Sequence, residues 1–319
     1  MPDAILSWEV NKMSTGKERV IAALKGQYTD AVPVSVMLGF LGAKLAGFTQ
    51  REFLTDVNKC VKSQLTAYER FKPDTMYATF GTLVIPEALG NELEFPVESA
   101  SRTKVRFLED KANFSKLKIP DPKRDKRLPG YLEICERVNS AVTGSTVGSS
   151  CAGPWNLAAE LRGLEQLIFD TIDDPDFVHN LMRFTTEVVN VVGSAVRETD
   201  IGLGIAEASA SCSVISPKMY REFVKPYHQG LVDYFKERKT WLSLHICGYT
   251  DPIMEDLVSE GYSSLSIDSP SSLRKMVQVS QKKVTVVGNV STILFAQGSK
   301  EEIEAAVKEC LRIAAPGSR

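Results

Sequence analysis

Short apolar runs rich in β-branched residues alternate along this chain with longer stretches of helical periodicity. The longer stretches carry apolar residues at helical spacing, as in residues 174–198, and helix-start signals such as Ser216–Pro217 and Asp251–Pro252. Alternation of this kind is typical of βα units and of a parallel sheet. Seven strands are predicted, at residues 32–38, 74–80, 144–151, 202–207, 241–247, 264–268 and 284–289.

The number of strand–helix units predicts a (β/α)8 TIM barrel. A parallel barrel needs eight strands to close, and 319 residues is a typical length for that fold. The printed chain ends in AAPGSR, just after the predicted helix end at Gly317, where an eighth strand would begin. We therefore expect that the final strand is missing from the printed chain. An open doubly wound sheet is the alternative.

No break in composition divides the sequence, so residues 1–319 are expected to form a single barrel domain. Residues 81–130 are rich in Pro, Lys and Asp and are expected to be an insertion or long loop at one end of it.

The composition excludes several classes of protein. The net charge is −2 and no apolar run is long enough to span a bilayer, so neither a nucleic acid nor a membrane is an expected partner. The N-terminal residues lack the basic and apolar regions of a secretion signal. The six cysteines are scattered, unlike those of a disulfide scaffold. We expect a cytoplasmic protein with reduced thiols.

A histidine and a cysteine stand one residue apart in the fifth predicted strand. Residues two apart in a strand point to the same face, so His245 and Cys247 should project together. A helix start at Asp251–Pro252 follows within four residues, which places both at the carboxyl end of the strand, where barrels carry their active sites. Imidazole and thiolate suit tetrahedral zinc, but a zinc site needs at least three protein ligands. A buried thiol beside a hydrogen-bonded histidine is the alternative.

Other polar groups are expected at the same strand ends. Glu207 and Asp268 are candidate catalytic carboxylates, although each alone could be a solvated loop residue. The candidate substrate-binding residues are Trp155, Tyr249 and Asn289, with a core position as the alternative for Trp155.

The remaining histidines and the last cysteine are expected to have structural roles. His179 and His228 lie in predicted helices and are interpreted as surface or packing residues, and Cys310 as a packing residue of the last helix.

Five stretches of this sequence together resemble the uroporphyrinogen decarboxylase superfamily. The resemblance runs from about Thr15 to Gly317 and implies a (β/α)8 barrel. The stretches are GKERVIAALKGQYTDAVPV, AGPWNLAAELRG, ISPKMYREFVKPY, LHICGYTDPIMEDLVSEG and VVGNVSTILFAQGSKEEIEAAVKECL.

Within this superfamily, the chain is similar to the corrinoid-dependent methyltransferases. The decarboxylase branch has an R-x-x-x-R segment after its first strand, whereas MLGFLGAKLAGF here contains only Lys44. A site for a polycarboxylate needs fixed guanidinium groups, so porphyrinogen decarboxylation is disfavoured. The methyltransferase branch has H-x-C on its fifth strand. The resemblance implies that His245 and Cys247 bind zinc, with a third, cysteine ligand beyond Arg319 and with Glu207 or Cys212 as a possible further ligand.

This branch implies a zinc-dependent methyltransferase that acts with a separate corrinoid protein. The methyl group would move between methylcobalamin on that partner and a small thiol such as coenzyme M, or a methoxy or methylamine compound. The alternatives are a uroporphyrinogen decarboxylase-like enzyme and a metal-free partner that binds a corrinoid protein.

Overall fold

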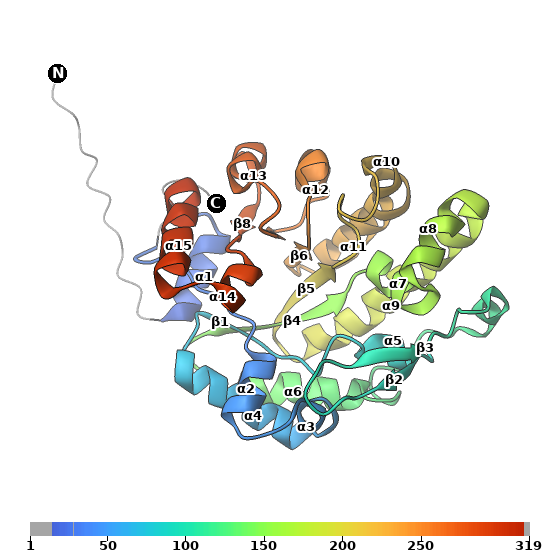
Figure 1. The fold of residues 1–319 in the computed structure, drawn as a ribbon, viewed down its shortest axis with the longest axis horizontal. Helices are drawn as coiled ribbons and strands as arrows, with labels where there is room; N and C mark the ends of the chain where they lie inside the picture. Colours follow the sequence, from blue (N-terminus) through green and yellow to red (C-terminus); the bar gives the residue numbers. More distant parts are fainter. Residues whose placement is uncertain (1–14, 28, 316–319) are drawn as a thin grey trace.

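The computed structural model describes residues 15–27 and 29–315. Its centre is a parallel sheet of six strands in the order β1-β4-β5-β6-β7-β8. Figure 1 shows that the sheet is curled, with helices around its outer side. The α/β class predicted from the alternation is thereby confirmed. The strands are β1 (Thr75–Tyr77), β4 (Thr146–Ala152), β5 (Gly202–Glu207), β6 (Leu242–Ile246), β7 (Ser264–Ile267) and β8 (Thr285–Val287).

Helices connect the successive strands, and their starts follow local sequence signals. Thr15 and Ser299 each form a capping box with the glutamate three residues later, and Asp174 caps a helix that begins with a proline. No helix in the described ranges has both the length and the apolar character needed to cross a membrane. The main helices are α1 (Gly16–Leu24), α2 (Gly39–Leu45), α3 (Gln50–Thr55), α4 (Val57–Phe71), α6 (Leu128–Ala141), α7 (Pro154–Arg162), α8 (Leu164–Asp173), α9 (Pro175–Glu198), α11 (Lys225–Glu237), α12 (Met254–Ser259), α13 (Leu273–Ser280), α14 (Thr292–Gln297) and α15 (Lys300–Ala314).

Two shorter helical segments complete the connections. The stretch before α11 consists of α10 (Pro217–Met219) and a π-helical turn, η2 (Tyr220–Val224). A 3-10 turn, η3 (Asp251–Ile253), precedes α12. Both segments lie where the sequence predicts helix starts.

The predicted strand at residues 32–38 does not form. Only Ser35 makes a bridge, parallel to the first residue of β1. Pro33 has no N–H to donate, and Val34 is held by Asp74: its N–H donates to the Asp74 carboxylate, and its carbonyl accepts the Asp74 N–H. The described residues therefore form a half-barrel with edges at β1 and β8, and the closed eight-stranded barrel is not seen in them.

The segment 81–130, expected to be an insertion or long loop, contains several short regular elements. It contains α5 (Val84–Ala88), an antiparallel pair of β2 (Glu92–Glu94) and β3 (Arg102–Val105), and a 3-10 helix, η1 (Lys111–Lys116). It ends in the first turn of α6.

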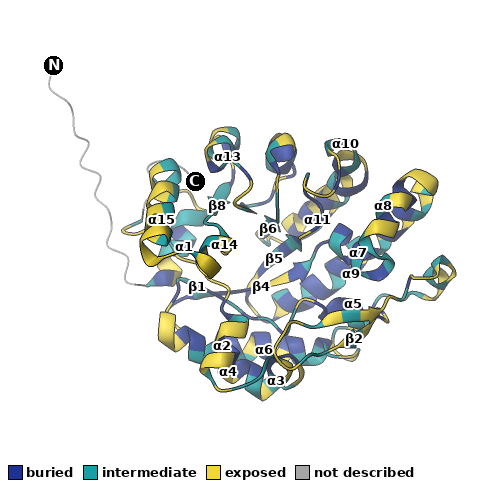
Figure 2. Ribbon diagram, viewed as in Figure 1, coloured by how far each residue is buried: buried dark blue, intermediate teal, exposed yellow. Residues whose placement is uncertain are grey.

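Alternate residues of each strand face opposite sides of the sheet. On the outer side Leu203 packs closely against α9, since a Cβ on Gly193 would lie 3.0 Å from the Leu203 side chain. On the same side Ser149 contacts the Tyr131 hydroxyl of α6. Figure 2 shows the helices buried toward the sheet and exposed on their far sides. The main core therefore lies between sheet and helices, and the remaining strand residues line the concave inner face.

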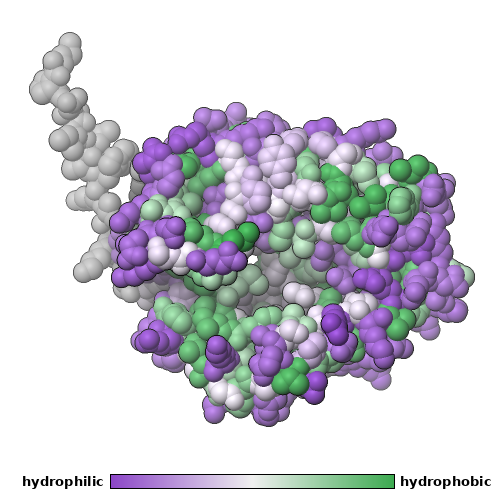
Figure 3. All heavy atoms as spheres, in the orientation of Figure 1, coloured by the Kyte–Doolittle hydropathy of each residue, from purple (hydrophilic) through white to green (hydrophobic). Residues whose placement is uncertain are grey.

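Large apolar side chains are exposed at both edges of the half-barrel. Met37, which precedes α2, is 72% exposed, and Ile293 of α14, after β8, is 68% exposed. Figure 3 shows hydrophobic atoms of this kind beside a central hollow. Among the described strands none pairs with the outer edge of β8.

Candidate metal and substrate site

His245 and Cys247 project together from the carboxyl end of β6 onto the inner face. The Cys247 Sγ lies 3.3 Å from the His245 Nε2, and the His245 Nδ1 lies 3.0 Å from the Ser266 Oγ of β7. His245 pairs in register with Ala206 of β5 and with Ser266, so these three residues share one face of the sheet. The Ser266 contact fixes the ring so that Nε2 is the nitrogen beside the thiol.

The pair has the geometry of two neighbouring zinc ligands. Tetrahedral zinc, with bonds of about 2.0 Å to nitrogen and 2.3 Å to sulfur, holds such atoms about 3.5 Å apart. The observed 3.3 Å is close to that separation. A hydroxyl on the other ring nitrogen is the kind of outer contact that orients a metal-binding histidine. No cluster of three or more His, Cys, Asp and Glu side chains suited to a metal occurs among the described residues.

Without a cation, both side chains of the pair favour their neutral forms. Burial lowers the pKa of His245, against the raising effect of the Asp268 charge. Burial and the same charge raise the pKa of Cys247. The imidazole is therefore available as a neutral ligand, whereas a thiolate at Cys247 needs a nearby positive charge to be stabilised.

Asp268 and Asn289 link the ends of three neighbouring strands. The Asp268 carboxylate accepts the N–H groups of Gly248 and Ser269, at 2.9 and 2.7 Å. The Asn289 amide donates to the carbonyls of Asp268 and Ser271, at 3.2 and 2.8 Å. Asp268 follows β7 as Cys247 follows β6, so it is the carboxylate beside the pair. Asn289 uses its amide hydrogens to hold the loops in place.

Tyr249 lies on the rim of the same site. Its side chain is 40% exposed, and its N–H donates to the Ser213 Oγ. Its carbonyl accepts the Cys212 N–H, so the loop after β5 is tied to the loop after β6. An exposed ring at this position can contact a ligand that enters from solvent.

Glu207 does not belong to this site, contrary to the prediction from the sequence. It pairs in register with Ile246, the residue between His245 and Cys247, and so faces the helices. The side chain is completely buried, and its carboxylate accepts the N–H groups of Trp155 and Asn156 at the start of α7, at 3.1 and 2.8 Å. Glu207 can therefore be neither a metal ligand nor a catalytic group beside the pair.

Trp155, a predicted substrate-binding residue, does not line the open face of the site. The side chain is completely buried, and its Nε1 donates to the Ser209 carbonyl at 3.2 Å. Trp155 is a core residue, which was the alternative for a single aromatic side chain.

A buried histidine between two carboxylates lies behind the sheet. His228 of α11 places its Nε2 3.2 Å from Glu207 and its Nδ1 3.0 Å from Glu260, which also accepts the Tyr220 hydroxyl at 2.6 Å. Burial lowers the pKa of His228, but the Glu260 charge and the contacts with both carboxylates outweigh this and raise it to about 9. From the sequence, His228 is interpreted as a surface or packing residue, and this charged centre is missed. The carboxylates that contact His228 are 21 and 32 residues away along the chain, so no local pattern reveals them.

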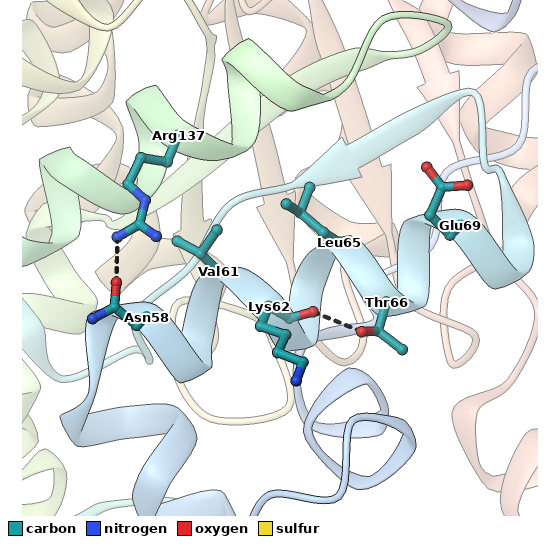
Figure 4. Close-up of a pocket in the computed structure, with 7 residues that line it drawn as sticks. All are labelled: Asn58, Val61, Lys62, Leu65, Thr66, Glu69 and Arg137. Atoms are coloured by element: carbon teal, nitrogen blue, oxygen red, sulfur yellow. Dashed lines mark hydrogen bonds between the residues drawn. The ribbon is translucent and has the colours of Figure 1, made fainter.

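A separate groove lies on the outer helices. Arg137 of α6 donates to the Asn58 side chain of α4 at 2.9 Å across it (Figure 4). It lies on α4 and α6, and none of its lining residues belongs to the His245–Cys247 site. The lining residues are Asn58, Val61, Lys62, Leu65, Thr66, Glu69 and Arg137.

These observations define an α/β protein with a parallel half-barrel and polar groups at the carboxyl ends of its strands. Sequence comparison identifies its family. The family model described as uroporphyrinogen decarboxylase (URO-D) matches residues 15–319. The chain therefore belongs to the uroporphyrinogen decarboxylase family, and the resemblance stated from its motifs is confirmed.

The relatives of this chain include both branches of the family. A methylcobamide:CoM methyltransferase of Methanosarcina barkeri is 24% identical over 315 residues, which cover 95% of this chain and 92% of that protein. A uroporphyrinogen decarboxylase of Xanthomonas axonopodis pv. citri is 26% identical over 269 residues, with 80% and 73% covered. The solved structure of a methyltransferase from Methanosarcina mazei has a TM-score of 0.84 at 24% identity, over 93% of this chain and 90% of that one, and shows the same fold.

Proposed function

We propose that this protein is a methyltransferase that moves a methyl group between a corrinoid on a partner protein and a small thiol or other methyl acceptor or donor. The proposal depends on one observation: the His245 Nε2 and the Cys247 Sγ lie 3.3 Å apart at the carboxyl end of β6. It is supported by the relatives named methylcobamide:CoM methyltransferases, one of which is matched over 92% of its length.

His245 and Cys247 are the proposed zinc ligands. Zinc bound there would deprotonate a coordinated thiol near neutral pH, or act as a Lewis acid on a methyl donor. Ser266 holds the His245 ring in the ligating orientation through Nδ1. Asp268 holds the Gly248 N–H and so fixes the backbone next to Cys247. Asp268 is also the proposed catalytic carboxylate.

Tyr249 and Asn289 are the proposed substrate-contacting residues. The exposed ring of Tyr249 stands at the rim, where a corrinoid protein would approach. Asn289 keeps the loops after β7 and β8 together, which sets the width of the opening on that side.

The inner face gives a reason to prefer methyl transfer to porphyrinogen decarboxylation. No Lys or Arg occurs in the six strands at a position that shares the His245 face. A polycarboxylate needs several fixed cationic donors, so these strands do not provide a site for it.

Zinc content and thiol-dependent demethylation of methylcobalamin test the proposal on the full-length protein. The wild type should contain one zinc and convert methylcobalamin in the presence of a thiol, followed by its visible spectrum. His245→Ala should lose the metal and at least about 100-fold of the rate. The control is His179→Ala, which removes an imidazole on α9 that contacts the Tyr227 hydroxyl and stacks on Phe223.

Unchanged zinc content in His245→Ala would refute the proposed site. A zinc-free wild type that still binds a corrinoid protein would favour the metal-free binding partner. Turnover of a porphyrinogen would favour the decarboxylase.

A further inference from the structure

The inner face of the sheet has a layer of hydroxyl groups directly beneath the His245–Cys247 pair. Residues paired in register on neighbouring parallel strands lie side by side and share a face. One such row contains His245 together with Ala152, Ala206, Ser266 and Val287. Two residues earlier in each strand lies the row that we name the hydroxyl layer: Ser150, Gly204, Ser243, Ser264 and Thr285.

The hydroxyl layer leaves the concave side of the sheet hollow. Barrel interiors are usually filled by bulky branched side chains, whereas this layer has four short hydroxyl residues and a glycine. Ser150 is exposed although it lies within β4, a strand with neighbours on both sides. Figure 3 shows a hollow near the centre of the face in view. Below the layer, the Tyr77 ring lies 3.7 Å from the Cβ position of Gly148 and closes the floor.

The hydroxyls of this layer have few partners in the protein. Ser264 is only 8% exposed, and its side-chain oxygen makes no hydrogen bond to a described residue. The Thr285 Oγ1 is buried and has no partner either. The Ser243 Oγ has one long contact, 3.4 Å to the Leu203 carbonyl. Because buried hydroxyls are nearly always hydrogen-bonded, unpaired ones on a hollow face indicate a ligand that supplies the missing bonds.

The charges around the layer define the chemical class of that ligand. No Lys, Arg, Asp or Glu lies in the hydroxyl layer or in the row that contains His245. A buried anion or cation there would have no counter-charge from either row, whereas a neutral hydroxyl, ether or amide would satisfy the unpaired groups. The layer lies about 7 Å below the pair along the strands, a distance that a short carbon chain spans.

We propose that the hydroxyl layer binds the uncharged, hydrogen-bonding tail of the small substrate whose sulfur or other heteroatom is held at His245 and Cys247. This assignment rests on the proposed function, because the pair anchors one end of the molecule. The layer selects the substrate and takes no part in the chemical step. A thiol with an alcohol or amide tail is favoured over one with a charged or purely apolar tail.

Calorimetric binding of three probe thiols to the zinc-containing, full-length protein tests this assignment. The probes are 3-mercapto-1-propanol, 1-butanethiol and 3-mercaptopropanesulfonate, which differ mainly in the tail. The alcohol should bind at least about tenfold more tightly than the other two. The double variant Ser264→Ala with Thr285→Val should lose that preference while its zinc content and its affinity for butanethiol are unchanged. Ser140→Ala, an exposed serine on α6, is the matched control and should keep the preference.

The other outcomes separate the proposed role of the hydroxyl layer from the proposed function. Equal binding of the alcohol and butanethiol, or tighter binding of the sulfonate, overturns the role of the hydroxyl layer and leaves the zinc site standing. An unchanged preference in the double variant does the same. Absence of zinc and of binding by all three thiols overturns the proposed function and the tail site together.

Discussion

The His228→Gln variant isolates the contribution of one buried imidazolium to the pH dependence of stability. The pKa of this histidine is 6.5 in an unfolded chain and about 9 in the folded protein, where Glu260 and Glu207 surround it. At 1.36 kcal/mol for each pKa unit, the difference corresponds to about 3 kcal/mol of stabilisation. No other described histidine lies between two buried carboxylates.

The sign of the effect follows from which state holds the proton. Below pH 6.5 the folded and unfolded forms are both protonated at this residue, and the full stabilisation is present. Between pH 6.5 and about 9 only the folded protein keeps the proton, so the free energy of unfolding falls as the pH rises. Above about pH 9 both states are neutral and this contribution is lost.

Urea unfolding, followed by circular dichroism between pH 6 and pH 9.5, measures the effect. The stability of the wild type minus that of His228→Gln should shrink by about 3 kcal/mol across this range. Glu260→Gln should weaken the dependence, because it removes the largest raising influence on the histidine. Tyr131→Phe is the control: it breaks a buried hydrogen bond to Ser149 without removing a group that titrates here. A difference curve that stays flat would refute the reasoning.

Two further substitutions probe the packing behind the sheet and the orientation of the ligand ring. A Cβ at position 153 would collide with the Glu207 carboxylate, so Gly153→Ala should destabilise the protein by about 2 kcal/mol in urea unfolding. Gly230→Ala, on an open helical surface, should be neutral or stabilising by up to about 1 kcal/mol, and equal losses at both positions would contradict this explanation. Ser266→Ala frees the His245 Nδ1 and should weaken zinc binding about 10-fold to 100-fold in a competition with a chelator, whereas unchanged affinity would show that the ring needs no such support.

The sequence predicts the sheet well where strand propensity and tertiary pairing agree. The runs from residue 144 onward become β4 to β8 with small shifts at their ends, because they alternate with helices and pair in parallel in the order of the chain. Residues 32–38 are also rich in valine but do not form a strand, because Pro33 and the side chain of Asp74 divert the backbone from the ladder. The side chain that competes with the ladder is 40 residues away, so no local pattern reveals it.

The two-residue period of a β-strand is enough to predict one part of the site from the sequence, but not the rest. His245 and Cys247 share a face because they are two apart, and this requires no knowledge of their neighbours. Whether Glu207 joins them depends on the register of β5 against β6, which pairs it with Ile246 instead. A shift of one residue in that register would have made the prediction correct. The hydroxyl layer likewise requires the register of five strands and is not apparent from any one of them.

The division of the strands into an inner and an outer set has an evolutionary consequence. Leu203, Ile205 and Glu207 stabilise the scaffold, whereas Gly204, Ala206 and their neighbours on the concave side have little part in the core. Substitutions in the second set can therefore accumulate at small thermodynamic cost, and new specificities can arise on an unchanged framework. A lineage of such proteins can thus retain one architecture while it explores many chemistries.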